Sequence, residues 1–154
     1  MRISISLLLL AVLVQGVMAE EPCPVVMSWT GISNSTAYGL AIDSSGNVYL
    51  TDTDNNQVQE YSSGRSGLIA GWGSKGSEEY QFDAPRGIAV DLSGTVYIAD
   101  SRNHRIQKYG ARINQTPLGS EGSGNGQFST PTGVAVDRSG NVYIADTGND
   151  RIQV

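Results

Sequence analysis

Residues 81–108 read QFDAPRGIAVDLSGTVYIADSRNHRIQK, and residues 127–154 read QFSTPTGVAVDRSGNVYIADTGNDRIQV. The two stretches are identical at 18 of 28 positions, far more than shared composition explains. A weaker first copy runs from about Gly39 to Gln59, so the copies are spaced 48 and 46 residues apart. A period of this length is typical of propellers and solenoids. We therefore expect one structural unit used three times.

Each copy has the pattern of short strands joined by tight turns. Its middle segment is Val-Tyr-Leu or Val-Tyr-Ile, at residues 48–50, 96–98 and 142–144, and such β-branched and aromatic runs favour strands. Before it lies a turn of the form Asp-x-Ser-Gly, whose Asp can cap backbone amides and whose Gly can supply a positive φ. We expect a second hairpin at residues 100–105 and 146–151. Since no stretch keeps a 3.6-residue period, we predict an all-β fold with no helix beyond the N-terminal segment.

The first strand of each copy is built from small residues. It reads Gly-Leu-Ala from Gly39, Gly-Ile-Ala from Gly87 and Gly-Val-Ala from Gly133. The blades of a propeller converge on an axis, where only small residues let neighbouring backbones approach closely. The bulkier tyrosines of the Val-Tyr segments fall on the next strand out, where there is room for blade to pack on blade. This gradient in size favours a β-propeller over a flat sandwich.

These segments resemble NHL repeats, whose pattern runs Pro-x-Gly-Ile/Val-Ala-Val-Asp, then Gly-Asn-Val-Tyr-Ile-Ala-Asp, then Asn-x-Arg-Ile-Gln. The resemblance covers residues 25–154, and the first copy is a divergent member because Gln57 replaces the arginine and no proline precedes Gly39. The resemblance implies a propeller of about six blades around a central channel. NHL propellers serve mostly as binding platforms, and a minority resemble lyases or lactonases that hold a metal in the channel.

The N-terminus has the three parts of a secretory signal. Arg2 is followed by a short apolar run and a small-residue site, which predicts a signal peptide at residues 1–19, cleaved between Ala19 and Glu20. The apolar run is shorter than the roughly 18–20 residues that cross a bilayer, so we expect a secreted or cell-surface protein with no membrane span in the mature chain. After a leader at residues 20–24, the NHL-type β-propeller occupies residues 25–154, with blades at about residues 37–73, 85–118 and 131–154.

Three blades are half of a six-bladed ring, which would leave apolar blade faces and strand edges uncovered. Residues 25–31 resemble the outermost strand expected at residues 68–73, and the last copy stops within its third strand. Two interpretations stay open. The chain is a fragment or truncated product of a longer propeller, or two chains close head to tail as a homodimer.

The composition limits the kinds of partner that we expect the chain to bind. The net charge is −5 and the lysines and arginines are scattered, which argues against nucleic acid. Cys23 is the only cysteine, so the chain forms no internal disulfide, and its thiol is either solvated or joined to another chain. Asn34 and Asn114 begin N-glycosylation patterns within expected loops.

The sequence offers little for a metal or cofactor, and we expect none. His104 is the sole histidine, too few for a zinc site, and is expected to be an exposed hairpin residue. Residues 52–56 begin like an EF-hand loop, but Gln57 stands where glycine is required. The glycine-rich residues 119–126 lack the Lys-Ser/Thr of a phosphate loop and match residues 71–77, so both segments are predicted as crossings between blades.

The candidate binding surface lies on the second hairpins of two copies, because loops on rigid scaffolds often carry function. It comprises Asn103, His104, Arg105, Asn149 and Arg151. The alternative is that these side chains form a polar network that builds the blade. We predict an exported, non-catalytic binding or interaction module with a protein or glycan ligand. Two alternatives stay open: a fragment of a metal-dependent lyase or lactonase whose active-site residues lie in other blades, and a purely structural cell-surface repeat.

Overall fold

The structure, a computed structural model, describes residues 36–63, 67–110 and 117–154. Several predicted features lie outside these residues: the signal peptide and its cleavage site at Ala19 and Glu20, the leader, Cys23, Asn34, Asn114 and the outer-strand match at residues 25–31. Those predictions stay predictions.

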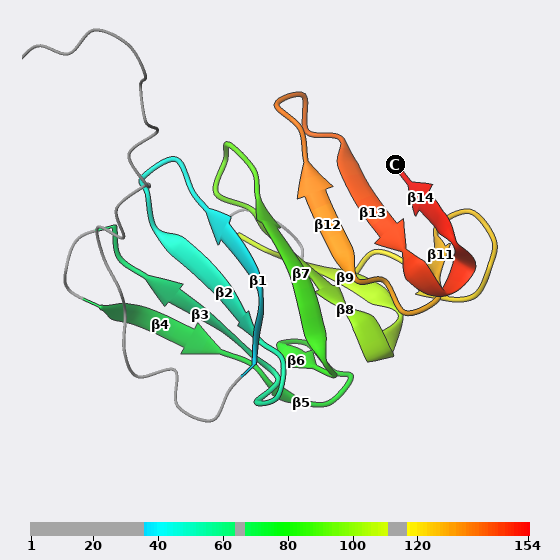
Figure 1. The fold of residues 1–154 in the computed structure, drawn as a ribbon, viewed down its shortest axis with the longest axis horizontal. Helices are drawn as coiled ribbons and strands as arrows, with labels where there is room; N and C mark the ends of the chain where they lie inside the picture. The colour runs from blue at the N-terminus through cyan, green and yellow to red at the C-terminus, as the bar shows by residue number, and fades with distance from the viewer. Residues whose placement is uncertain (1–35, 64–66, 111–116) are drawn as a thin grey trace, which may run out of the picture. The chain divides into compact units, whose positions relative to one another are not determined.

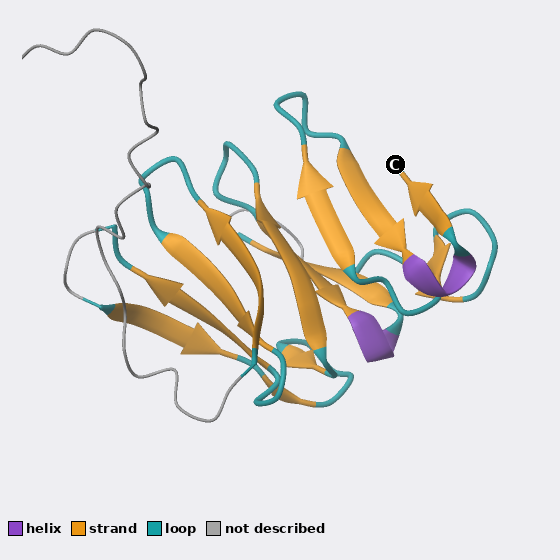
Figure 2. Ribbon diagram, viewed as in Figure 1, coloured by secondary structure: helices purple, strands orange, loops and turns teal. Residues whose placement is uncertain are grey.

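The described residues form three antiparallel sheets in which strands consecutive in sequence are neighbours (Figures 1 and 2). The first sheet contains β1 (Ala37–Ile42), β2 (Val48–Asp52), β3 (Gln57–Tyr61) and β4 (Leu68–Trp72). The second contains β7 (Pro85–Val90), β8 (Val96–Asp100) and β9 (Arg105–Tyr109). The third contains β12 (Gly133–Val136), β13 (Val142–Asp146) and β14 (Arg151–Gln153). This meander order is that of propeller blades, and the all-β prediction is confirmed.

The repetition extends to individual atoms. In the second sheet the Tyr97 hydroxyl donates to Asp91 Oδ2 at 3.2 Å, and in the third the Tyr143 hydroxyl donates to Asp137 Oδ2 at the same distance. The first sheet differs, since Tyr49 donates instead to Glu60 of its neighbouring strand at 3.1 Å. The last two copies are therefore close structural duplicates, and the first is the divergent one.

The turn between the first two strands of each sheet forms as the sequence predicts. Its aspartate Oδ1 accepts two backbone N–H groups at 2.8 to 2.9 Å, those of the residues two and four positions further on. Its glycine has a φ of 82° to 86°, in the left-handed region that favours glycine. The aspartates are Asp43, Asp91 and Asp137, and the glycines are Gly46, Gly94 and Gly140.

The connection between the second and third strands is a hairpin, as predicted, with Asp100 paired with Arg105 and Asp146 with Arg151. In the second and third sheets it is a single 3₁₀ turn, η1 (Ser101–Asn103) and η2 (Thr147–Asn149). Each turn ends at a residue with left-handed backbone, His104 at φ 54° and Asp150 at φ 51°. Apart from these single turns the described residues contain no helix, as predicted. A single 3₁₀ turn has no 3.6-residue period and therefore leaves no signal in the hydrophobic pattern.

The glycine-rich segments cross from one sheet to the next, and each contains a pair of strands that the sequence did not predict. The pairs are parallel: β5 (Ser74–Lys75) with β6 (Gln81–Phe82), and β10 (Ser120–Glu121) with β11 (Gln127–Phe128). Just before the second crossing, Leu118 forms an isolated antiparallel bridge with Ile106. Leu118 therefore occupies the place that β4 has in the first sheet.

Neighbouring sheets approach most closely at their first strands. A Cβ added at Gly39 would lie 2.3 Å from the Arg86 carbonyl oxygen, and one added at Gly87 would lie 2.8 Å from Gly133 Cα. Both distances are shorter than any real Cβ contact, so the small residues are required by the adjacent backbone. The size gradient inferred from sequence is thereby confirmed at both junctions.

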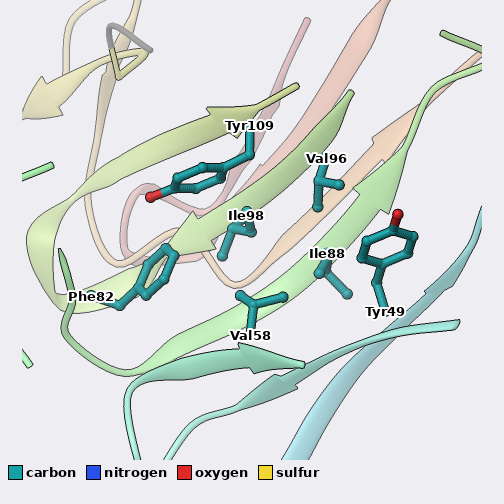
Figure 3. Close-up of a cluster of buried hydrophobic side chains, with 7 residues drawn as sticks. All are labelled: Tyr49, Val58, Phe82, Ile88, Val96, Ile98 and Tyr109. Carbon is teal, nitrogen blue, oxygen red and sulfur yellow. The ribbon is translucent and has the colours of Figure 1, made fainter. Parts of the chain in front are cut away.

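A hydrophobic core fills each junction between adjacent sheets. In the first, shown in Figure 3, Tyr49 and Val58 of the first sheet meet Ile88 and Ile98 of the second, and Phe82 closes the cluster. The second junction repeats this arrangement with equivalent residues. Its buried members are Ala99, Ile106, Phe128 and Ile144. Burial of these side chains is what holds sheet to sheet, because apolar area removed from water is the main favourable term in folding.

We predict that Gly87→Ala lowers the free energy of unfolding by about 1–3 kcal/mol, because the added methyl forces two backbones apart. Chemical denaturation measures the loss. Gly133→Ala is the matched control at the equivalent position of the third copy, where a Cβ meets only Ala145 Cβ at 3.3 Å. Equal losses in the two variants would contradict the close junction.

Candidate functional site

A buried carboxylate organises the second sheet. Asp100 is fully buried, and its Oδ2 accepts hydrogen bonds from Asn103 Nδ2 at 2.9 Å, Arg105 Nε at 2.8 Å and Gln107 Nε2 at 3.0 Å. Its Oδ1 accepts the Asp83 backbone N–H at 2.8 Å. A carboxylate without water is stable only when such donors replace its solvation.

The third sheet repeats the arrangement around Asp146, which is also fully buried. Its Oδ2 accepts from Asn149 Nδ2 at 2.9 Å, Arg151 Nε at 2.7 Å and Gln153 Nε2 at 3.1 Å, and its Oδ1 accepts the Ser129 N–H at 2.7 Å. Burial opposes ionisation of Asp146, but the hydrogen bonds outweigh it, so the pKa of this carboxyl lies below its usual range.

The arginine of each network also holds the crossing segment. Arg105 donates from its two terminal nitrogens to the carbonyl oxygens of Ser77 at 2.6 Å, Glu78 at 3.0 Å and Gln81 at 3.0 Å. Arg151 donates in the same way to three carbonyl oxygens, those of Ser123, Gly124 and Gln127, at 2.7 to 2.8 Å. The planar fork of arginine suits this task, and lysine could not reproduce it.

The first sheet keeps the carboxylate without the arginine. Asp52 Oδ2 accepts from Asn55 Nδ2 at 3.0 Å and from Gln59 Nε2 at 3.4 Å, and Gln57 stands where the fork would be. The network is therefore smaller and looser in the copy whose sequence diverges.

Most residues of the predicted binding surface make their hydrogen bonds within the protein. Asn103, Arg105, Asn149 and Arg151 direct their donors at the buried carboxylates and the crossing segments. These contacts are those of the alternative, a polar network that builds the blade. A ligand role for these residues stays a prediction.

His104 is not the exposed hairpin residue that was expected. Its Nδ1 accepts the Thr130 N–H at 3.0 Å, and its Nε2 lies 3.9 Å from Glu121 Oε1. The side chain is mostly buried because the left-handed backbone at this residue turns it toward the segment that leads into the third sheet. It is a contact between copies.

A polar cleft of about 290 Å³ lies between the first and second sheets, at the end where the 3₁₀ turn and the crossing segment meet. It is lined by Thr53, Asp54, Asn56, Lys75, Asp83, Ala84, Arg86 and Arg102. Three of these side chains are cations and two are carboxylates, so the cleft has one net positive charge in an acidic protein.

The cleft cations occupy positions whose chemistry changes from copy to copy. Where the second copy has Arg86, the first has Tyr38 and the third Thr132. The residue equivalent to Arg102 is Asp54 in the first copy and Gly148 in the third, and that equivalent to Lys75 is Glu121 in the third. The repeated residues build the sheets, and these cleft residues do not take part in that repeated framework. Because no copy shares them, the sequence comparison that revealed the fold could not single them out.

The cations differ in how far they are neutralised. Arg102 lies 3.6 Å from Asp83 and is largely exposed. Arg86 stacks its guanidinium over the Tyr38 ring at 5.3 Å, and its Nε is buried with no hydrogen-bond partner. Among the described residues, neither Arg86 nor Lys75 has an acidic partner. The side chain of Arg86 therefore contrasts with that of Arg105, whose donors are nearly all used.

The described residues show neither a metal-binding cluster nor a membrane-spanning helix. Those residues contain no cluster of three or more His, Cys, Asp or Glu side chains placed to hold a metal ion. Within the same residues, no helix has the length and apolar character needed to cross a membrane.

A family model described as NHL repeat matches residues 38–61, 82–109 and 128–154. Among curated proteins, none matches the chain. Solved structures similar to the chain include a virginiamycin B lyase from Staphylococcus aureus with quinupristin, at TM-score 0.59 and 18% identity over 78% of this chain and 38% of that one. A nidogen/laminin complex matches at TM-score 0.53 and 19% identity, over 77% of this chain and 47% of that one.

A gluconolactonase from Xanthomonas campestris is similar at TM-score 0.53 and 15% identity, over 73% of this chain and 35% of that one. The chain thus spans less than half the length of each of these structures. At such identities the likeness concerns the fold alone.

We predict that the protein loses stability as the pH falls below about 4, the ordinary pKa of an unfolded aspartate. A carboxyl whose folded pKa is lowered, as at Asp146, contributes stability that is present above that value and is lost as the pH falls through the folded pKa. Asp146→Asn should destabilise the protein at pH 7 by about 2 kcal/mol or more, because a buried donor replaces an acceptor. It should also flatten the acid limb of a plot of unfolding free energy against pH.

Asp150→Asn is the control, since this exposed left-handed position accepts asparagine. An Asp146→Asn variant as stable at pH 7 as the control would contradict the role given to the carboxylate.

Proposed function

Because the chain belongs to the NHL-repeat family, we propose that it is an exported, non-catalytic binding module that engages its ligand at the polar cleft between the first and second sheets. The observation that carries the proposal is the contrast between two kinds of polar residue. The recurring ones are saturated by internal hydrogen bonds, and the cleft cations recur in no other copy and include unpaired groups. Sheets built from repeated residues, with non-repeated residues lining the cleft, suit a binding platform.

Export is supported by the N-terminal pattern of cation, apolar run and small-residue site. In a secreting host the mature protein would begin at Glu20. An extracellular address fits a protein or glycan as the ligand.

The enzyme alternative has a specific observation behind it, since a lyase and a gluconolactonase are among the structures with a similar fold. In that case the catalytic set would lie partly in further blades of a longer protein. Stoichiometric zinc or calcium in the purified protein would favour it over the binding module. The third alternative, a purely structural repeat, would bind nothing on a glycan or peptide array.

The uncovered sheet faces suggest a second partner, another copy of the same chain. Ile152 is 72% exposed, whereas the equivalent Val58 and Ile106 are fully buried by the next sheet. The side chains that cover such positions come from the opposite face of a sheet, and in the first sheet that face exposes Leu40 and Ile42. Two chains could therefore cover each other's apolar faces by the same packing that already joins the sheets within one chain.

We predict that residues 20–154 form a head-to-tail dimer, as measured by light scattering. Ile152→Asp should convert it to a monomer, because a carboxylate cannot be buried against Leu40 and Ile42. Leu92→Asp, at an exposed turn, should leave the mass unchanged. A folded, stable monomer of the unmodified chain would contradict the dimer and leave the cleft proposal standing.

We predict that the exported protein binds a defined subset of a glycan and peptide array. Arg86→Thr and Arg102→Gly, which install the residues of the third copy, should reduce that binding at least tenfold without changing the far-ultraviolet circular dichroism. The control is Arg138→Thr, at an exposed turn remote from the cleft. Ligands that bind the cleft variants and the unmodified protein equally would overturn the assignment of the cleft.

A further inference from the structure

We propose that the cleft between the first and second sheets recognises a carboxylated sugar, a ligand with one carboxylate and several hydroxyl groups. This inference rests on the proposed function and adds the chemical class of the ligand. It begins from the Arg86 side chain, the group in the cleft that most lacks a partner.

The Arg86 Nε is buried and has no hydrogen-bond partner in the part of the chain that the structure describes. Leaving a buried donor unpaired is costly, more so when the donor is charged, and such groups persist in proteins where a ligand or water completes them. Arg105 and Arg151 show what the same side chain does when it is structural, since each pairs its Nε with a buried carboxylate at 2.7 to 2.8 Å. Arg86 lines the cleft, so a ligand carboxylate there would bond the terminal nitrogens of its guanidinium and offset a charge that no acidic side chain among the described residues neutralises.

The charges around Arg86 select a ligand with a single negative charge. Lys75 and Arg86 are unpaired among the described residues, and Arg102 is already beside Asp83. One carboxylate would neutralise the net positive charge, whereas the second charge of a phosphate monoester would face Asp54 and Asp83. Carboxylate is also the planar partner that the arginine fork binds with two hydrogen bonds.

The carboxylates of Asp54 and Asp83 also line the cleft and can accept hydrogen bonds from ligand hydroxyl groups. Asp54 already accepts the Thr36 hydroxyl and Asp83 lies beside Arg102, and each carboxylate has further lone pairs for a hydroxyl donor. The Asn56 side chain oxygen is already bonded to the Ala84 N–H at 2.8 Å, which fixes its position in the wall. Next to Arg86 lies the mostly exposed Tyr38 ring, an apolar surface beside the charged one. At about 290 Å³ the cleft is at the small end of ligand sites, which fits one sugar ring better than a folded peptide segment.

Isothermal titration of residues 20–154 with methyl β-D-glucuronide tests the inference. Binding should be at least tenfold tighter than that of methyl β-D-glucoside, which lacks the carboxylate, and of glucose 6-phosphate, which carries two charges. Arg86→Thr should weaken glucuronide binding at least tenfold. Lys75→Glu, which installs the residue of the third copy at an exposed position, should weaken it as well and serves as a second variant if the first fails to fold.

Arg138→Thr should bind as the unmodified chain does. Absence of glucuronide binding, or binding that is the same in the Arg86 and Lys75 variants, would overturn the inference. If N-acetyl-aspartate amide binds more tightly than the glucuronide, the ligand class is an acidic peptide and not a carboxylated sugar. In either case an array ligand that depends on Arg86 would keep the proposed function, so the two failures are distinguishable.

Discussion

The buried aspartate at the end of the second strand is the constraint on which the rest of the sheet depends. Asp100 and Asp146 each accept four hydrogen bonds, from the strand that follows, from the 3₁₀ turn and from the segment that enters the sheet. A buried carboxylate is stable only when hydrogen-bond donors replace its water, and these donors come from all three segments. The same arginine that neutralises the carboxylate holds three carbonyl oxygens of the crossing segment, so strand, turn and crossing are positioned together.

Because these hydrogen bonds hold each sheet in place, positions outside the network can differ from copy to copy. Arg105 and Arg151 occupy equivalent positions and make equivalent hydrogen bonds. Nearly all of their donors are used within the fold. Arg86 lies on β7, two strands from Arg105 in the same sheet, and its equivalents are a tyrosine and a threonine. Its Nε has no acceptor among the described residues. Arginines of one chain thus differ in how they are bonded, and membership of the fold family alone does not predict this difference.

Much of the fold could be predicted from sequence because its signals are local and repeated. The local geometry can be predicted from the Asp-x-Ser-Gly turns, the Val-Tyr strands and the glycines of the first strands. The glycines also predict the close junction at Gly87. The 3₁₀ turns and the two-residue parallel pairs are local but too short to leave a periodic pattern in the sequence. The contact of His104 with Thr130 joins residues far apart in the chain. The cleft could not be predicted from sequence, because its lining residues come from the first sheet, the crossing segment and the second sheet and do not recur from copy to copy.

The most direct test of this account is nuclear magnetic resonance of the arginine Nε–H groups in the processed protein, with and without a carboxylated sugar. The account predicts two slowly exchanging signals, from Arg105 and Arg151, that do not respond to the ligand, and an Arg86 signal that shifts on addition. Rapid exchange at Arg105 and Arg151, or a ligand response at those residues and none at Arg86, would contradict the division between framework and site.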